Sequence, residues 1–150
     1  MLKILLIIWM CLAAGVDMRQ RRVPNLLVAT GLLGALFCLL FTRHTLTGAS
    51  WGQGAAAMLV GLLLSVPGYR QGRMGAGDVK LLAVLGLASD LSVVLISVAG
   101  AGLAMAIWAL IHPHLPSRLM NLCPAGNFRR PPYLPFLLIG FIPAIALLHI

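Results

Sequence analysis

Acidic side chains are almost absent from this sequence. Its 150 residues include 11 Lys and Arg but only three acids, Asp17, Asp78 and Asp90, and there is no glutamate. Charged residues make up 9% of the chain, hydrophobic residues 61%, and the mean hydropathy is +1.01. Soluble domains contain about 25% charged residues. This shortage of charge excludes a soluble globular domain and predicts an integral membrane protein surrounded by the lipid bilayer.

Cysteine is also scarce. Cys11 and Cys38 fall inside apolar runs and Cys123 in a loop, an odd number without C-x-x-C spacing. That pattern indicates neither a disulfide framework nor a zinc site. His112 and His114 offer metal ligands together with Cys123, but only in a loop without a fixed scaffold. We therefore expect no metal and no cofactor.

Basic residues give the chain a formal net charge of +8. A soluble nucleic-acid-binding protein would gather them on one face of a polar domain. Here they stand in short clusters between apolar runs, which is the positive-inside pattern of membrane proteins. Nucleic acid is therefore not an expected partner.

Apolar runs predict where the helices lie. The predicted helices are at about 2–16, 25–42, 53–68, 79–89, 91–111 and 133–149. Residues 79–111 as one helix would reach about 50 Å, well beyond the ~30 Å hydrocarbon core. Ser89 and Asp90 offer a cap for a new helix, so we expect a break there. The predicted fold class is all-α, with about six transmembrane helices in a single membrane-embedded domain over residues 1–150.

Charge asymmetry predicts the orientation of these helices. Basic clusters follow the first, third and fifth helices, and they contain Arg19, Arg21, Arg22, Arg70, Arg73, Arg118, Arg129 and Arg130. Six spans place all three clusters on one side, whereas merging the fourth and fifth helices would place the last cluster on the other. Because basic loops stay in the cytoplasm, we expect both termini on the non-cytoplasmic side.

Two of the three acids share one side in this topology. Asp17 ends the first helix and Asp78 begins the fourth, so both lie at the cytoplasmic face, whereas Asp90 lies on the other side as a helix cap. A carboxylate at the border of a span is costly and by default indicates function. Two at matching depth suit an aspartyl protease, in which one carboxyl keeps a proton while the other activates water.

Two glycines come shortly before Asp78, in the stretch MGAGD. Without a Cβ, Gly75 and Gly77 permit a tight backbone conformation and let a substrate backbone come close to Asp78. Structural roles also explain the same acids one by one. Asp78 alone suits a helix N-cap, and Asp17 alone suits a solvated acid in a basic loop.

Three stretches of the sequence resemble one family. MGAGDVKLLA, which contains Asp78, is similar to the G-x-G-D signature of the type IV prepilin leader peptidases, which are membrane aspartyl proteases. DMRQRRVPN, which starts at Asp17, resembles the segment that carries the family's first aspartate ahead of a Pro-Asn pair. PPYLPFLLIGF, from residue 131, resembles the family's last helix more loosely, because Leu134 stands where many relatives have glycine.

The resemblance implies that Asp17 and Asp78 are the catalytic pair of a membrane aspartyl endopeptidase. The implied substrate is a prepilin or pseudopilin protein, whose short basic leader is cut at the cytoplasmic end of its hydrophobic segment. Larger relatives carry an extra cytoplasmic domain and also N-methylate the new terminus. This short chain resembles the peptidases of Flp or tight-adherence pili, which implies proteolysis in the bacterial inner membrane without a separate methyltransferase domain.

Two other functions suit a small membrane protein of this kind. A proton or cation transporter needs acids at the bilayer midplane or a continuous polar path, and the sequence shows neither. A non-catalytic pilus-assembly membrane protein would keep the fold without the activity, and the intact aspartate pair argues against it.

Overall fold

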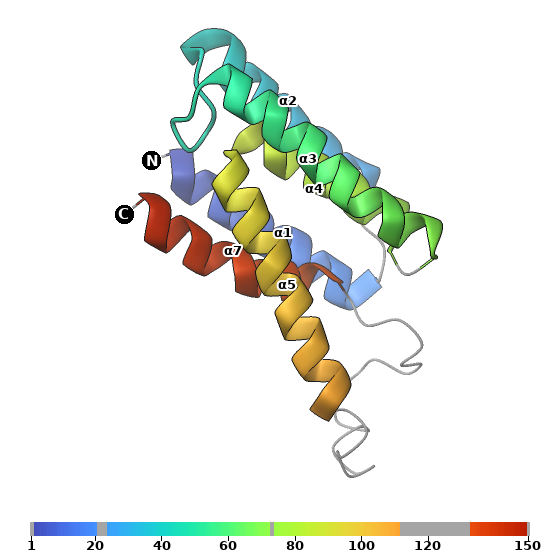
Figure 1. The fold of residues 1–150 in the computed structure, drawn as a ribbon. Helices are drawn as coiled ribbons and strands as arrows, with labels where there is room; N and C mark the ends of the chain where they lie inside the picture. Colours follow the sequence, from blue (N-terminus) through green and yellow to red (C-terminus); the bar gives the residue numbers. More distant parts are fainter. Residues whose placement is uncertain (1, 21–23, 73, 112–132, 150) are drawn as a thin grey trace.

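A computed structural model describes residues 2–20, 24–72, 74–111 and 133–149 of the chain. Within these residues the structure is all-helical (Figure 1). Its helices are α1 Leu2–Gln20, α2 Asn25–Thr42, α3 Trp51–Arg70, α4 Ala76–Ala88, α5 Leu91–Ile111 and α7 Tyr133–His149. The prediction of an all-α fold with six helices is confirmed for this part of the chain. The possible metal ligands in the loop after α5, which are His112, His114 and Cys123, lie outside the described residues.

The observed helix bounds differ from the predicted bounds mainly at the end of α1 and at the start of α4, where charged residues follow or interrupt the apolar runs. The apolar run of the first helix ends at residue 16, yet α1 continues to Gln20 because Met18 and Arg19 are good helix formers. α4 begins at Ala76 and not at residue 79, since the glycine-containing stretch itself forms the first turn. Both Asp17 and Asp78 therefore lie inside helices.

α4 is the centre of the helix bundle. It packs against α2, α3 and α5, while α7 packs against α1 and α5 (Figure 1). The second half of α4 is almost wholly buried, and Leu81 and Leu85 have no exposed surface. A helix that is apolar all round is typically buried. The 13 residues of α4 extend about 20 Å, less than the ~30 Å of a hydrocarbon core.

Glycines allow the helices around the core to cross closely. A Cβ on Gly86 of α4 would lie 2.6 Å from backbone atoms of Ala57 in α3. At the crossing of α5 and α7, a Cβ on Gly100 would lie 2.5 Å from Cα of Gly140. Small residues of this kind let helix backbones touch in membrane proteins. The second crossing fixes the position of α7.

The turn between α2 and α3 meets the turn between α4 and α5 at one end of the bundle. The N–H of Leu46 donates to the carbonyl of Ala88 at 3.0 Å, and Thr47 Oγ1 donates to Asp90 Oδ2 at 3.5 Å. Asp90 Oδ1 accepts the N–H of Val93 at 2.9 Å, so the prediction that Asp90 caps a helix is confirmed. Both ends of the chain lie toward this side of the bundle (Figure 1).

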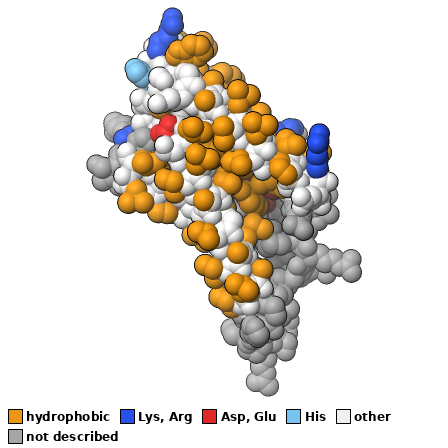
Figure 2. Space-filling view, viewed as in Figure 1, with side chains coloured by type: hydrophobic (Ala, Val, Ile, Leu, Met, Phe, Trp, Pro, Cys, Tyr) orange, Lys and Arg blue, Asp and Glu red, His pale blue; other side chains and the backbone are white. Residues whose placement is uncertain are grey.

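The outer surface of the bundle is apolar. Hydrophobic side chains cover most of the face in Figure 2, and Lys and Arg side chains stand at its edges. Leu26, Leu40 and Leu147 are each more than 70% exposed. Three helices, α2, α3 and α5, are long and apolar enough to cross a membrane. Such a surface is expected where the surroundings are lipid and not water.

Candidate active site

Asp17 lies on the buried face of α1. Leu6, Met10 and Ala13 are buried along α1, and Asp17 follows Leu6 by about three helical turns on the same face. The side chain of Asp17 is 5% exposed. The alternative that Asp17 is a solvated acid is therefore wrong. A carboxylate buried at this depth needs a hydrogen-bond donor.

The N-terminus of α7 supplies such a donor. The backbone N–H of Leu134 donates to Asp17 Oδ2 at 3.3 Å. Leu134 lies in the first turn of α7, where N–H groups have no partner within the helix and the helix dipole is positive. The hydrogen bond and the dipole both favour a negative charge on Asp17, whereas its burial favours the neutral form.

Leu134 thus has a role that the sequence analysis missed. Its side chain is fully buried in the hydrophobic core, while its backbone faces the acid. Leucine at this position offers the backbone N–H and adds core contacts through its side chain. One signal was present in the sequence. The prolines of PPYLP mark the start of a helix, and the first N–H groups of any helix are available to an anion.

Asp78 occupies the third position of α4. Its Oδ2 accepts the backbone N–H of Gly75 at 3.1 Å, so the side chain reaches back to the residue that precedes the helix. The alternative that Asp78 is itself the N-cap is wrong, because Gly75 occupies that position. Unlike Asp17, Asp78 is half-exposed.

Gly75 leaves room for the carboxylate of Asp78. A Cβ on Gly75 would lie 3.3 Å from Asp78 Oδ2, which is a tight contact. The backbone of Gly75 is ordinary, with φ of −76°. Space therefore explains this glycine better than the tight conformation that the sequence suggested. Gly77 follows in the first turn of α4 and is half-buried. A role of Gly75 and Gly77 in binding substrate stays a prediction.

Asp17 and Asp78 interact electrostatically although they belong to different helices. Asp78 lies in the first turn of α4, outside the three helices that are long enough to cross a membrane. Its pKa is raised from 3.8 to about 6, mainly by burial and secondly by the negative charge of Asp17, while the hydrogen bond from Gly75 lowers it. The structure thus brings together the two acids that the sequence predicts to be neighbours.

Tyr133 adjoins this pair. It is the first residue of α7 and is half-buried against the hydrophobic core. Its chain neighbour Leu134 donates a backbone hydrogen bond to Asp17, which places Tyr133 beside that acid. No motif in the sequence points to Tyr133, and its one signal is an aromatic residue between prolines at the start of the last helix.

Lys80 and Asn25 connect two helices near the acids. Lys80 Nζ donates to Asn25 Oδ1 at 3.4 Å, which joins the start of α4 to the start of α2. Within the described part of the chain, no group of three or more His, Cys, Asp and Glu side chains is placed to hold a metal ion.

Two unequal carboxyl groups make acid and base chemistry possible. Asp17 is deeply buried and receives an N–H at a helix N-terminus, whereas Asp78 is half-exposed and holds its proton to a higher pH than an ordinary aspartate. When two carboxyl groups differ in this way, one can act as base while the other acts as acid. Such a pair can activate a water molecule and protonate a leaving group.

Comparison with known families agrees with this site. A model of the type IV leader peptidase family matches residues 4–110, which is more than half of the chain. The matched stretch contains both acids and nearly all of α1 to α5, whereas α7 lies beyond it. No curated protein and no solved structure matches the chain. The extent of the family match, together with the paired acids inside it, shows that the chain belongs to the type IV leader peptidase family and is a protease of that class.

Proposed function

We propose that the chain is a membrane aspartic endopeptidase that removes the short basic leader of Flp-type prepilin or pseudopilin subunits. The observation that carries this proposal is the electrostatic coupling of Asp17 and Asp78 at one end of an apolar helix bundle. Family membership supports the reaction class. The Flp-type substrate is the one that the resemblance of the sequence implies.

Asp17 acts as the general base in this proposal. The N–H of Leu134 favours its charged form, which removes a proton from water as the water attacks the scissile carbonyl carbon. Asp78 acts in its protonated form, donates a hydrogen bond to the carbonyl oxygen and then passes its proton to the leaving amine. A bound substrate excludes water from the half-exposed Asp78, which favours the protonated form further.

The distribution of basic residues supports an active site at the cytoplasmic face of the bacterial inner membrane. Arg19, Arg70 and Lys80 lie at the same end of the bundle as the acid pair, whereas Lys3 and Arg43 lie at the other. The excess of basic residues marks the cytoplasmic end. All six helices then form one membrane-embedded domain with both termini on the non-cytoplasmic side.

The position of the acids favours the peptidase over a proton or cation transporter. Asp17 lies in the last turn of α1 and Asp78 in the first turn of α4, so both are at helix ends and not midway along a span. An acid at a membrane border can reach a peptide in the cytoplasm. An ion path requires acids within the membrane interior.

Cleavage of a prepilin in liposomes tests the proposal. The wild-type chain and its Asp78→Asn variant are reconstituted with a purified Flp-type prepilin, and the new N-terminus is sequenced and weighed. We expect the wild type to cut the prepilin after its basic leader and to leave the new N-terminus unmethylated. We expect the Asp78→Asn variant to leave the prepilin intact. Cutting at an equal rate by Asp78→Asn would rule out the acid pair as the catalyst.

A further inference from the structure

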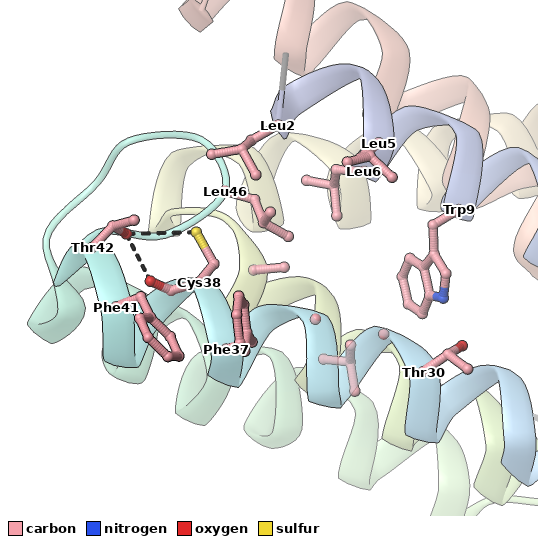
Figure 3. A pocket seen from close by; sticks show the side chains of 14 residues that line it. Leu2, Leu5, Leu6, Trp9, Thr30, Phe37, Cys38, Phe41, Thr42 and Leu46 are labelled. Atoms are coloured by element: carbon pink, nitrogen blue, oxygen red, sulfur yellow. Dashed lines mark hydrogen bonds between the residues drawn. The ribbon is translucent and has the colours of Figure 1, made fainter.

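An open apolar groove runs between α1 and α2, with α4 as its floor. Its volume is about 350 Å³. Figure 3 shows Leu2, Leu6 and Trp9 of α1 facing Phe37 of α2 across this groove. Val84 and Ala88 of α4 lie beneath them. The groove lies toward the end of the bundle away from the acid pair, because it uses the start of α1 and the end of α4.

The polar side chains along this groove already have partners in the protein. Trp9 Nε1 and Thr30 Oγ1 both donate to the carbonyl of Leu27, at 3.2 and 2.9 Å. Thr42 Oγ1 donates to the carbonyl of Cys38 at 2.7 Å. Among the residues that the structure describes, none with a charged side chain lines the groove. An occupant therefore gains from apolar contact and not from hydrogen bonds, which excludes a basic leader peptide as the ligand.

Two glycines give the α2 side of the groove its shape. The ring of Trp9 packs on Gly31, where an added Cβ would collide with it. A Cβ on Gly34 would meet no atom within 4 Å, although Gly34 also lines the groove. The backbone is therefore open at Gly34, and small residues at such a place let another helix approach closely.

The groove and the acid pair share two helices. On α1, Leu6 lines the groove and Asp17 lies on the same face about three turns later, a rise of about 16 Å. On α4, Val84 lines the groove and Asp78 lies about 9 Å away along the helix axis. A straight apolar helix in the groove would have one end directed toward the two carboxyl groups.

We propose that this groove binds the hydrophobic segment that follows the leader in the prepilin substrate. The inference rests on the proposed function and adds the place where the uncut substrate is held. With the scissile peptide at the acid pair, the segment reaches the level of Trp9 after about 12 Å, which is about eight helical residues. The apolar side chains beyond that point pack between α1 and α2. A free lipid chain is the competing occupant, and its binding would not depend on the position of the two acids.

A leucine at position 34 tests the groove without disturbing the fold. Gly34→Leu adds a Cβ that meets no atom within 4 Å, and leucine also has the better helix propensity. Gly102 in α5 is a matched control, because it is exposed, an added Cβ there meets no atom within 4 Å, and it does not line the groove. We expect Gly34→Leu to raise KM for the prepilin at least tenfold with kcat within threefold, and Gly102→Leu to leave both within twofold.

Photo-crosslinking identifies the occupant directly. A photoreactive residue replaces Leu5, which lines the groove and is 61% exposed, or Leu103 of α5, which is 67% exposed. In Asp78→Asn protein with bound prepilin, we expect crosslinks to the hydrophobic segment from position 5 and none from position 103. Crosslinks from position 5 to lipid alone would contradict binding of the substrate in the groove, and so would an unchanged KM in Gly34→Leu. In either case, cleavage by the wild type would still support the proposed function. Absence of wild-type cleavage overturns both.

Discussion

The two ends of the helix bundle both hold a buried acid, but they use it differently. At one end Asp90, 9% exposed, accepts the N–H of Val93 and the hydroxyl of Thr47, so its oxygens join one turn to the next. At the other end Asp17 and Asp78 act on each other electrostatically, and the pKa of Asp78 rises to about 6. A buried acid surrounded by donors serves the fold. A buried acid beside another acid is set up for proton transfer.

Replacing the paired acids should have the largest effect. We expect Asp17→Asn and Asp78→Asn each to lower kcat/KM for prepilin cleavage by at least about 100-fold, since general acid and base catalysis each contribute about 10²–10⁴-fold. The double variant should lose little more than either single variant, because the two groups act as a unit. Asp90→Asn is the matched control at the other end and should stay within about threefold of the wild type. Equal losses in all three single variants would erase the contrast between the ends.

Truncation of Leu134 should separate its side chain from its backbone. Leu134→Ala removes a fully buried side chain, which should lower the free energy of unfolding by about 2–5 kcal/mol. The N–H that donates to Asp17 is kept, so the folded protein should retain kcat within about threefold. Thermal unfolding in detergent and cleavage assays below the unfolding temperature measure the two effects. A stable but inactive Leu134→Ala protein would contradict the assignment of the backbone N–H to Asp17.

The raised pKa of Asp78 should appear in the pH profile of cleavage. The protonated form is the active one in the proposed mechanism, and it persists up to about pH 6 and is lost above it. We therefore expect kcat/KM to fall above about pH 6, by about tenfold per pH unit. The fall in kcat should begin at a higher pH than the fall in kcat/KM, because bound substrate keeps water from Asp78 and so favours its protonated form. A profile that is flat from about pH 5 to 8 would remove Asp78 as the acid.

The smallest effect should come from the cap at the other end. Asp90→Ala leaves the N–H of Val93 without its partner, which should lower the free energy of unfolding by about 0.5–2 kcal/mol. Prepilin cleavage by the folded protein should be unchanged within about threefold. Comparison of melting temperatures with Thr47→Val would show how much of the loss belongs to the second hydrogen bond.

The sequence predicts the helices and the grouping of the acids well. Apolar runs give the bounds of α2, α5 and α7 as they are observed. Because successive helices run in opposite directions, Asp17 and Asp78 are predicted at the same end of the bundle and Asp90 at the opposite end. The first turn of α4 was harder, because the glycines of MGAGD suggested a loop, whereas Gly75 serves as the N-cap of a helix that contains Asp78.

Helix packing is what the sequence leaves undetermined. In a soluble helix the polar face marks the side away from the core, but α5 and the second half of α4 are apolar on every side, whether they face lipid or protein. The hydrogen bond between Leu134 and Asp17 joins residues far apart in the chain and depends on that packing. The groove between α1 and α2 depends on it as well.

The titration of the aspartate carboxyl groups tests the central claim, that Asp17 and Asp78 form a coupled pair. Because the chain has three aspartates and no glutamate, protein labelled with carboxyl-¹³C aspartate gives few side-chain signals, which NMR can follow in micelles. We expect Asp78 to titrate near pH 6 in the wild type and at a lower pH in Asp17→Asn, with the Asp90 signal the same in both. Titration of Asp78 at one pH in both proteins would contradict the coupling.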